Sequence, residues 1–153
     1  MKLLEIADEK AFSSLILPDR SYVSYQLLFD LLNPSLVSVG RLGEFAFLAG
    51  SYVYTGSSRR YIRKRILRHL SRRKKLHWHI DYLLANPRVR MSGIVLSETS
   101  ECELNRRTAG RIIVPRFGAT DCREGCGSHL KFVGKISNES HPTRTNAISV
   151  RLS

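Results

Sequence analysis

The chain has 153 residues, and its 25 Lys and Arg against 13 Asp and Glu give a formal net charge of +12. This length fits one domain, and 42% hydrophobic with 25% charged residues excludes a disordered or collagen-like chain. So large a positive charge is typical of proteins that bind polyanions, so we expect a polyphosphate partner.

Location can also be inferred from composition. No apolar stretch approaches the ~20 residues that span a bilayer, so no membrane association is expected. Acidic residues precede the short apolar run near the N-terminus, which argues against a secretory signal. The three cysteines, an odd number, indicate reduced thiols and not a disulfide framework. We therefore predict a cytoplasmic protein.

We expect three parts along the chain: an N-terminal extension at 1–21 with one short helix, a folded domain at 22–136 and a polar tail at 137–153. In the first half of the domain, β-rich residues predict a strand at 22–32, a small hairpin at 37–48 and a strand at 51–55.

Helical signals dominate the second half. Apolar residues four apart, Ile62, Ile66 and Leu70, predict a helix over 59–71 with Ser57 or Ser58 as N-cap. A second helix is expected from 78 and stops before Pro87, followed by a strand at 89–96 and a helix at 100–110. A loop with glycines and cysteines at 117–127 then leads to a strand at 130–133. Mixed strands and helices predict an α/β (α+β) fold.

A basic segment at 59–75 carries most of the excess charge and contains no acid. A solvated helix face is the plain interpretation of such a run. Like charges one turn apart destabilise a helix, however, and an external anion is the simplest compensation, which favours nucleic acid. The basic residues are Arg59, Arg60, Arg63, Lys64, Arg65, Arg68, Arg72, Arg73, Lys74 and Lys75.

Arg65 and His69 fall along one edge of the apolar stripe of this helix. A guanidinium there can bind a phosphate through two hydrogen bonds, and an imidazole one turn later can move a proton. The alternative is that both side chains only cover the stripe with their apolar parts.

Five blocks follow one another in a specific order: "GSYVYTGS", "RILRHL", "KKLHWHIDYLL", "ECEL" and "FGATDC…SHL". Together with Tyr25 on the first strand, this order resembles the GIY-YIG nuclease superfamily, and in particular its small Uri-type endonuclease-like family. The resemblance implies a small, mostly antiparallel sheet flanked by helices. It also implies metal-dependent hydrolysis of phosphodiester bonds in nucleic acid. We expect DNA in preference to RNA as the substrate, and a monomer or homodimer.

The resemblance assigns roles to five residues. Tyr25 and Tyr54 would be the motif tyrosines, Arg65 the catalytic arginine, His69 the histidine one turn on, and Glu101 the ligand of Mg²⁺ or Mn²⁺. A carboxylate suits such hard cations. Positive charge nearby would favour a phenolate that accepts a proton from water. The expected nucleic-acid contacts are Gly56, where the backbone could approach a phosphate, Ser57, and the basic segment apart from Arg65.

Two assignments leave alternatives open. Val23 occupies the position where the family motif has its glycine, and this puts catalysis in question. The alternative function is therefore a nucleic-acid-binding module of the same fold. Tyr22 is an alternative to Tyr25 as the first motif tyrosine. Glu103 competes with Glu101, although Leu104 places Glu101 beside the inward face of its helix.

A second constellation combines Cys122, Cys126 and His129 with His79. These are ligand types that Zn²⁺ selects, so the group is a candidate zinc cluster. The alternative is structural, with His79 and Asp81 hydrogen-bonding the loop.

Overall fold

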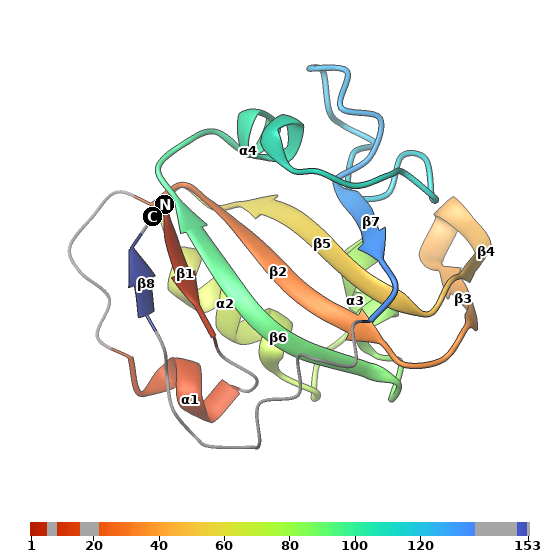
Figure 1. Ribbon diagram of the computed structural model, residues 1–153, viewed down its shortest axis with the longest axis horizontal. Coiled ribbons are helices and arrows are strands. Elements are labelled where there is room, and N and C mark those ends of the chain that lie inside the picture. The colour runs from red at the N-terminus through yellow and green to blue at the C-terminus, as the bar shows by residue number, and fades with distance from the viewer. Residues whose placement is uncertain (6–8, 16–21, 137–149, 153) are drawn as a thin grey trace.

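The computed structural model describes residues 1–5, 9–15, 22–136 and 150–152. Within these residues the main sheet has six strands, all antiparallel, in the order β7-β5-β2-β6-β1-β8 (Figure 1). The strands are β1 (Lys2–Leu4), β2 (Ser24–Leu31), β5 (Gly50–Ser57), β6 (Val89–Ser97), β7 (Leu130–Gly134) and β8 (Val150–Leu152). The predicted α+β class is confirmed.

Two helices, α2 (Ile62–Leu70) and α3 (His79–Leu84), lie on one face of this sheet, behind it in Figure 1. Smaller elements stand at its margins: α1 (Glu9–Ser13), α4 (Glu101–Arg107), and a separate hairpin of β3 (Ser35–Val39), the 3-10 turn η1 (Gly40–Leu42) and β4 (Gly43–Phe47). No helix in the described ranges is long and apolar enough to cross a bilayer.

The core lies between the sheet and the helix layer. The odd-numbered residues of β2 from Tyr25 to Leu31 are buried, whereas Leu28 and Asp30 on the opposite face are partly exposed. This period of two is what a strand with one face against a helix layer requires. Further core residues are Tyr52, Ile66, Ile80, Leu83, Ile94 and Leu96.

Each strand and helix predicted within 22–136 is present, with shifted ends. The first helix begins at Ile62 and not at 59, and its N-cap is Tyr61, not a serine. The Ser58 hydroxyl instead accepts a hydrogen bond from the Tyr61 N–H at 3.3 Å, in the turn before the helix. Local side-chain bonding of this kind competes with helical hydrogen bonds.

The segment predicted as an N-terminal extension contributes to the fold. Its strand β1 pairs with β6, with Leu3 opposite Val95, and Phe12 of α1 is fully buried. Strand β8, from the predicted tail, pairs with β1. Three-residue strands are too short to show a period in sequence, which is why neither was predicted. Most of that tail, 137–149, lies outside the described residues.

An ion pair joins α2 to the start of α3. The Arg68 guanidinium donates to both carboxylate oxygens of Asp81 at 2.9 Å, and Asp81 also accepts from the backbone N–H groups of His77 and Trp78. Burial opposes the charge of Asp81, but these donors outweigh it and hold the pKa of Asp81 below its usual value. A fully buried carboxylate with four donated bonds fixes the angle between the helices.

The Asp81→Asn variant is expected to lose about 3 kcal/mol of unfolding free energy, because it leaves Arg68 without its charge partner. Urea denaturation measures the loss. The matched control is Glu103→Gln, which removes a carboxylate that is also paired to arginine but is screened by solvent, so it is expected to cost much less than Asp81→Asn. Equal losses for the two variants would contradict this interpretation.

Candidate functional site

A pocket of about 630 Å³ opens where the start of β2 and the end of β5 meet α4 and the loop before β7. The sheet brings its tyrosines there, because Tyr25 pairs with Gly56 across β2 and β5. Of the five residues given catalytic roles from sequence, four line the pocket: Tyr25, Tyr54, Arg65 and Glu101.

His69 does not line the pocket but lies behind Tyr25. Its Nε2 is 2.6 Å from the Tyr25 hydroxyl, and both side chains are buried. Burial, reinforced by the Lys74 cation, lowers the pKa of His69 to about 3. The imidazole is therefore neutral, and its hydrogen bond to the Tyr25 phenol links it to the pocket.

Both pocket tyrosines are held as neutral phenols. Burial raises the pKa of Tyr25 and of Tyr54 well above the usual value, and the opposing effect of Arg65 is weaker. The expectation that positive charge favours a phenolate is therefore wrong for the protein alone. Desolvation of the charged form decides the outcome, and it cannot be judged from sequence.

Gly56 makes room for Tyr25. A Cβ atom at this position would lie 2.5 Å from the Cζ and hydroxyl of the Tyr25 ring, closer than side chains tolerate. The sequence analysis expected this glycine to admit a phosphate to the backbone; the structure gives it a packing reason instead.

Arg65 ties α2 to the end of β5. Its guanidinium donates to the Ser57 carbonyl at 2.6 Å, and its Cζ lies 4.8 Å from the centroid of the Trp78 ring. The Arg68 guanidinium lies 4.3 Å from the same ring. The indole therefore holds two cations beside the pocket by cation–π contact.

Of the two glutamates left open, Glu101 lies in the pocket and Glu103 does not. Glu101 accepts a hydrogen bond from the Ser57 hydroxyl at 2.8 Å, and its other oxygen is 3.0 Å from Nδ1 of His129. Glu103 lies on the outer side of α4, paired with Arg106 and Arg107. Burial lowers the pKa of His129, but Glu101 and neighbouring thiols outweigh it and raise the value to about 9.

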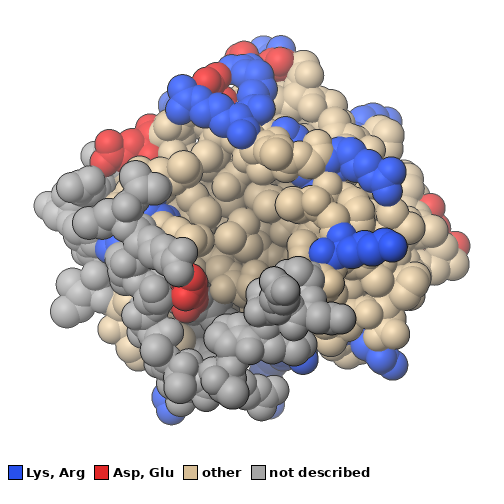
Figure 2. All heavy atoms as spheres, in the orientation of Figure 1, with Lys and Arg blue, Asp and Glu red and all other residues tan. Residues whose placement is uncertain are grey.

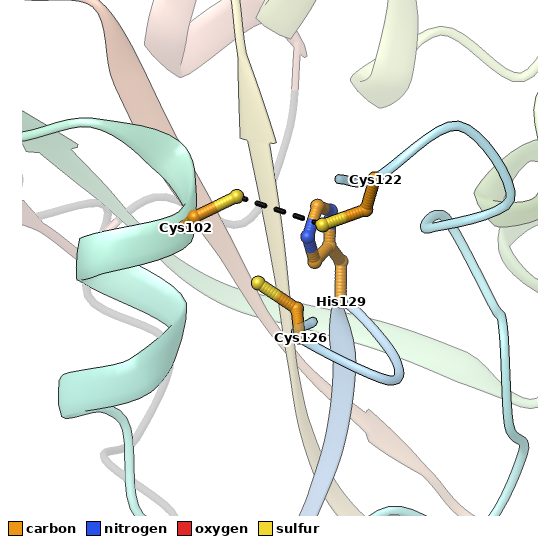
Figure 3. A group of neighbouring side chains, drawn as sticks. All are labelled: Cys102, Cys122, Cys126 and His129. Atoms are coloured by element: carbon orange, nitrogen blue, oxygen red, sulfur yellow. Dashed lines mark hydrogen bonds between the residues drawn. The ribbon is translucent and has the colours of Figure 1, made fainter. Parts of the chain in front are cut away.

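The soft-ligand cluster differs from its prediction in one member. The ligand atoms of Cys102, Cys122, Cys126 and His129 all lie within 4.8 Å of one another, and the four side chains point toward one another (Figure 3). They form a candidate zinc-type site. His79 is not part of it, because its Nδ1 accepts the Gly118 N–H at 2.9 Å.

Sequence analysis missed Cys102 as a ligand. It lies on α4, far along the chain from the loop that carries the other three residues, and only the tertiary fold brings them together. The available signal was the third cysteine itself, since it directly follows the pocket glutamate Glu101.

Some cations of the basic segment bond to other described residues, and others are exposed. Arg63 donates to the carbonyls of Ser13 and Leu15, Arg68 binds Asp81, and Lys74 donates to the carbonyls of Arg68 and His69. These three of the predicted nucleic-acid contacts therefore serve the fold. The exposed ones are Arg59, Arg60, Lys64, Arg72, Arg73 and Lys75.

The open face of the sheet shows no positive patch at its middle (Figure 2). Helix α2 lies behind the sheet in Figure 1, on the other side from the face drawn in Figure 2. On that drawn face uncharged residues fill the middle of the described surface, and Lys and Arg lie mainly at its margins, mixed with acids over α4.

Comparison with known proteins identifies the family. The family described as "Domain of unknown function DUF123" matches residues 24–150, most of the chain. The chain belongs to this DUF123 family. No curated protein and no solved structure matches it significantly.

Membership of DUF123 overturns the resemblance to the GIY-YIG superfamily and its Uri-type family. The matched family has no assigned function, and no match to GIY-YIG proteins is found. That identification is wrong. Short blocks such as "YTG" contain few residues, so they carry less family information than their order suggested. The roles implied by the resemblance lose that support and must rest on the geometry of this DUF123 protein.

Buried His69 predicts an acid-sensitive fold. The unfolded imidazole takes up a proton near its ordinary pKa of 6.5 and the folded one only near 3, so stability is fully present above 6.5 and is lost as pH falls below it. Between pH 7 and pH 5 this loss amounts to about 2 kcal/mol.

Urea denaturation at both pH values, for wild type and for His69→Gln, measures this loss. Other titrating groups are common to both proteins, so the difference between their pH dependences isolates His69. Identical dependences would show that His69 titrates normally in the fold.

Proposed function

We propose that this protein binds nucleic acid, DNA in preference to RNA, and hydrolyses its phosphodiester bonds in the pocket with the help of Mg²⁺ or Mn²⁺. One observation carries the proposal: Arg65, Glu101 and Tyr25, which bonds to buried His69, line one pocket beside a segment that carries exposed cations. A cation that binds phosphate, a carboxylate that holds a hard metal ion and a proton relay are the parts that phosphodiester hydrolysis needs.

The free cations adjoin the pocket at both ends of the basic segment. Arg59 follows two residues after Ser57, and Lys75 precedes His77 by two; Ser57 and His77 both line the pocket. A strand bound along this segment would therefore pass the pocket mouth. Release of counterions from its phosphates would supply most of the affinity.

Arg65 and Glu101 would act directly on the phosphate and on the cation. The Arg65 guanidinium, held by Ser57 and Trp78, would bind the scissile phosphate and stabilise its growing charge. Glu101 would hold the divalent cation, with Asp121 as a further acid of the lining. One or two carboxylates, completed by water and substrate oxygens, suit Mg²⁺, so the donor set fits. When bound, the cation supplies Lewis-acid stabilisation of the phosphate oxygens.

Proton transfer would run through the buried pair. The attacking water passes a proton to the Tyr25 oxygen as the Tyr25 proton moves to Nε2 of His69, 2.6 Å away. Neutral His69 offers a lone pair for this step. Burial is the main cause of the low pKa of His69, and the Lys74, Arg68 and Arg65 cations add to it. A bound phosphate would oppose the effect of these cations and so make the imidazole a better proton acceptor.

A nucleic-acid-binding module without efficient catalysis is the second candidate. It is favoured by the raised pKa of both pocket tyrosines and by the engagement of both Glu101 oxygens, one by Ser57 and one by His129. These features keep the proton acceptor neutral and leave fewer lone pairs for a metal ion.

A cleavage assay separates the two candidates. We expect wild type to cut at least one of a panel of labelled single-stranded, duplex and branched DNA and RNA substrates with Mg²⁺ or Mn²⁺. Glu101→Gln is expected to lower the rate by about 10²–10³-fold, because it removes the charged metal ligand. Glu103→Gln, on the outer side of the same helix, is the matched control and should cut as wild type does. Binding without cutting by wild type would leave only the binding module.

Affinity should depend steeply on salt through the free cations. Replacing Arg72 and Arg73 by Ala is expected to reduce the slope of log affinity against log salt by about 0.7–0.9 for each phosphate that the protein no longer neutralises. Fluorescence anisotropy with a labelled oligonucleotide measures this slope. Arg106→Ala with Arg107→Ala, which removes ion-paired arginines of α4, should leave it unchanged. A larger effect from the α4 pair would place the binding surface elsewhere.

A further inference from the structure

We infer that Cys102, Cys122, Cys126 and His129 bind one structural Zn²⁺ ion, which clamps α4 to the loop before β7 and orients His129 against Glu101. The cluster borders the pocket, whose lining includes Cys102, Cys122 and His129, but its soft donor set differs from the carboxylates proposed to hold Mg²⁺ or Mn²⁺ there. It rests on distances, on an unpartnered buried histidine and on the donor set.

The sulfur spacing matches tetrahedral zinc. Sγ of Cys102 lies 3.7 Å from Sγ of Cys122. Two thiolates bound to one tetrahedral Zn²⁺ at about 2.3 Å lie about 3.8 Å apart. A disulfide would need about 2.05 Å, so these sulfurs are placed as co-ligands and not as a bonded pair.

His129 supplies the second observation. Its side chain is only 4% exposed, and neither ring nitrogen has a hydrogen-bond partner among the described residues. Nδ1 lies 3.0 Å from a Glu101 oxygen, but without hydrogen-bond alignment. Buried polar atoms without partners cost free energy, and coordination of a metal removes that cost.

The donor set selects zinc and closes the site. Three thiols and one imidazole are soft or borderline ligands, which favour Zn²⁺ over Mg²⁺ or Mn²⁺. Four protein ligands complete a tetrahedron and leave no position for a substrate. The ion is therefore structural, unlike a catalytic zinc with an open position.

The position of His129 links the zinc site to the pocket. Because Nδ1 faces the Glu101 carboxylate, we assign Nε2 as the zinc ligand. A zinc-bound histidine commonly donates its other N–H to a carboxylate, and this fixes both its ring and its tautomer. Cys102 follows Glu101 directly on α4, so the same ion anchors the helix that carries the pocket carboxylate.

The path of the loop suits this clamp. Gly125 and Gly127, on either side of Cys126, have φ of +72° and +77°. These left-handed conformations turn the chain sharply around Cys126, and the loop reaches His129 two residues after Gly127. Glycine at both positions is what allows ligands so close in sequence to converge on one ion.

The metal content of the purified full-length protein, kept reduced, tests the proposal. We expect one zinc per chain by mass spectrometry. Co²⁺-substituted protein should show thiolate-to-cobalt charge transfer and the intense visible bands of a tetrahedral site. Neither readout depends on nuclease activity, so failure here and failure of the proposed function are distinguishable. Wild type that takes up neither metal, or that holds a Cys102–Cys122 disulfide in place of thiols, would overturn the proposal.

Variants test the ligand assignment. Cys102→Ser and Cys126→Ser should each lose stoichiometric zinc and the tetrahedral cobalt spectrum. His79→Ala should retain both, because His79 bonds Gly118 and is not a ligand. Zinc loss in His79→Ala with retention in Cys102→Ser would overturn the assignment. A variant could also lose metal by failing to fold, so chelator treatment of wild type provides a second measurement. The melting temperature should fall when zinc is removed and recover when zinc is added. An unchanged melting temperature would overturn the proposal that zinc clamps α4 to the loop.

Discussion

The Glu101 carboxylate is the contact on which the pocket depends. Through Ser57 it binds the end of β5, through His129 it meets the loop before β7, and its own helix closes the pocket from the third side. Three elements far apart in sequence thus converge on one half-buried charge. A carboxylate held from both sides in this way has little freedom, so a cation bound to it would have a fixed position.

Burial sets the chemistry of the rest of the site. Tyr25 and His69 are kept neutral because they lie in the core, at the end of the apolar face of β2, although cations surround them. The cations are in turn divided by the fold. Some, such as Arg68 with Asp81, hold the helix layer in place, and the others remain free beside the pocket. The site therefore joins a fixed, neutral interior to an exposed, positively charged margin.

Periodicity in the sequence was sufficient for most of the fold. The four-residue spacing of Ile62, Ile66 and Leu70 predicted α2, and Pro87 marked the end of α3. The short strands at the two ends of the chain were missed because three residues show no period. Glu101 was favoured correctly over Glu103 as the inward residue. Cys102 could not be identified as a neighbour of the loop cysteines, because its proximity is set by packing of α4 and not by spacing along the chain. The family identification was wrong, since short motifs do not fix ancestry.

Hydrogen–deuterium exchange of the full-length protein, with and without a single-stranded DNA oligonucleotide, tests most directly whether the pocket and the basic segment form one nucleic-acid site. The account predicts that DNA slows exchange together at 59–75 and in the pocket loop 118–129, while the β3–β4 hairpin is unchanged. Protection confined to the hairpin or to the open face of the sheet, with none at 59–75 or 118–129, would contradict it.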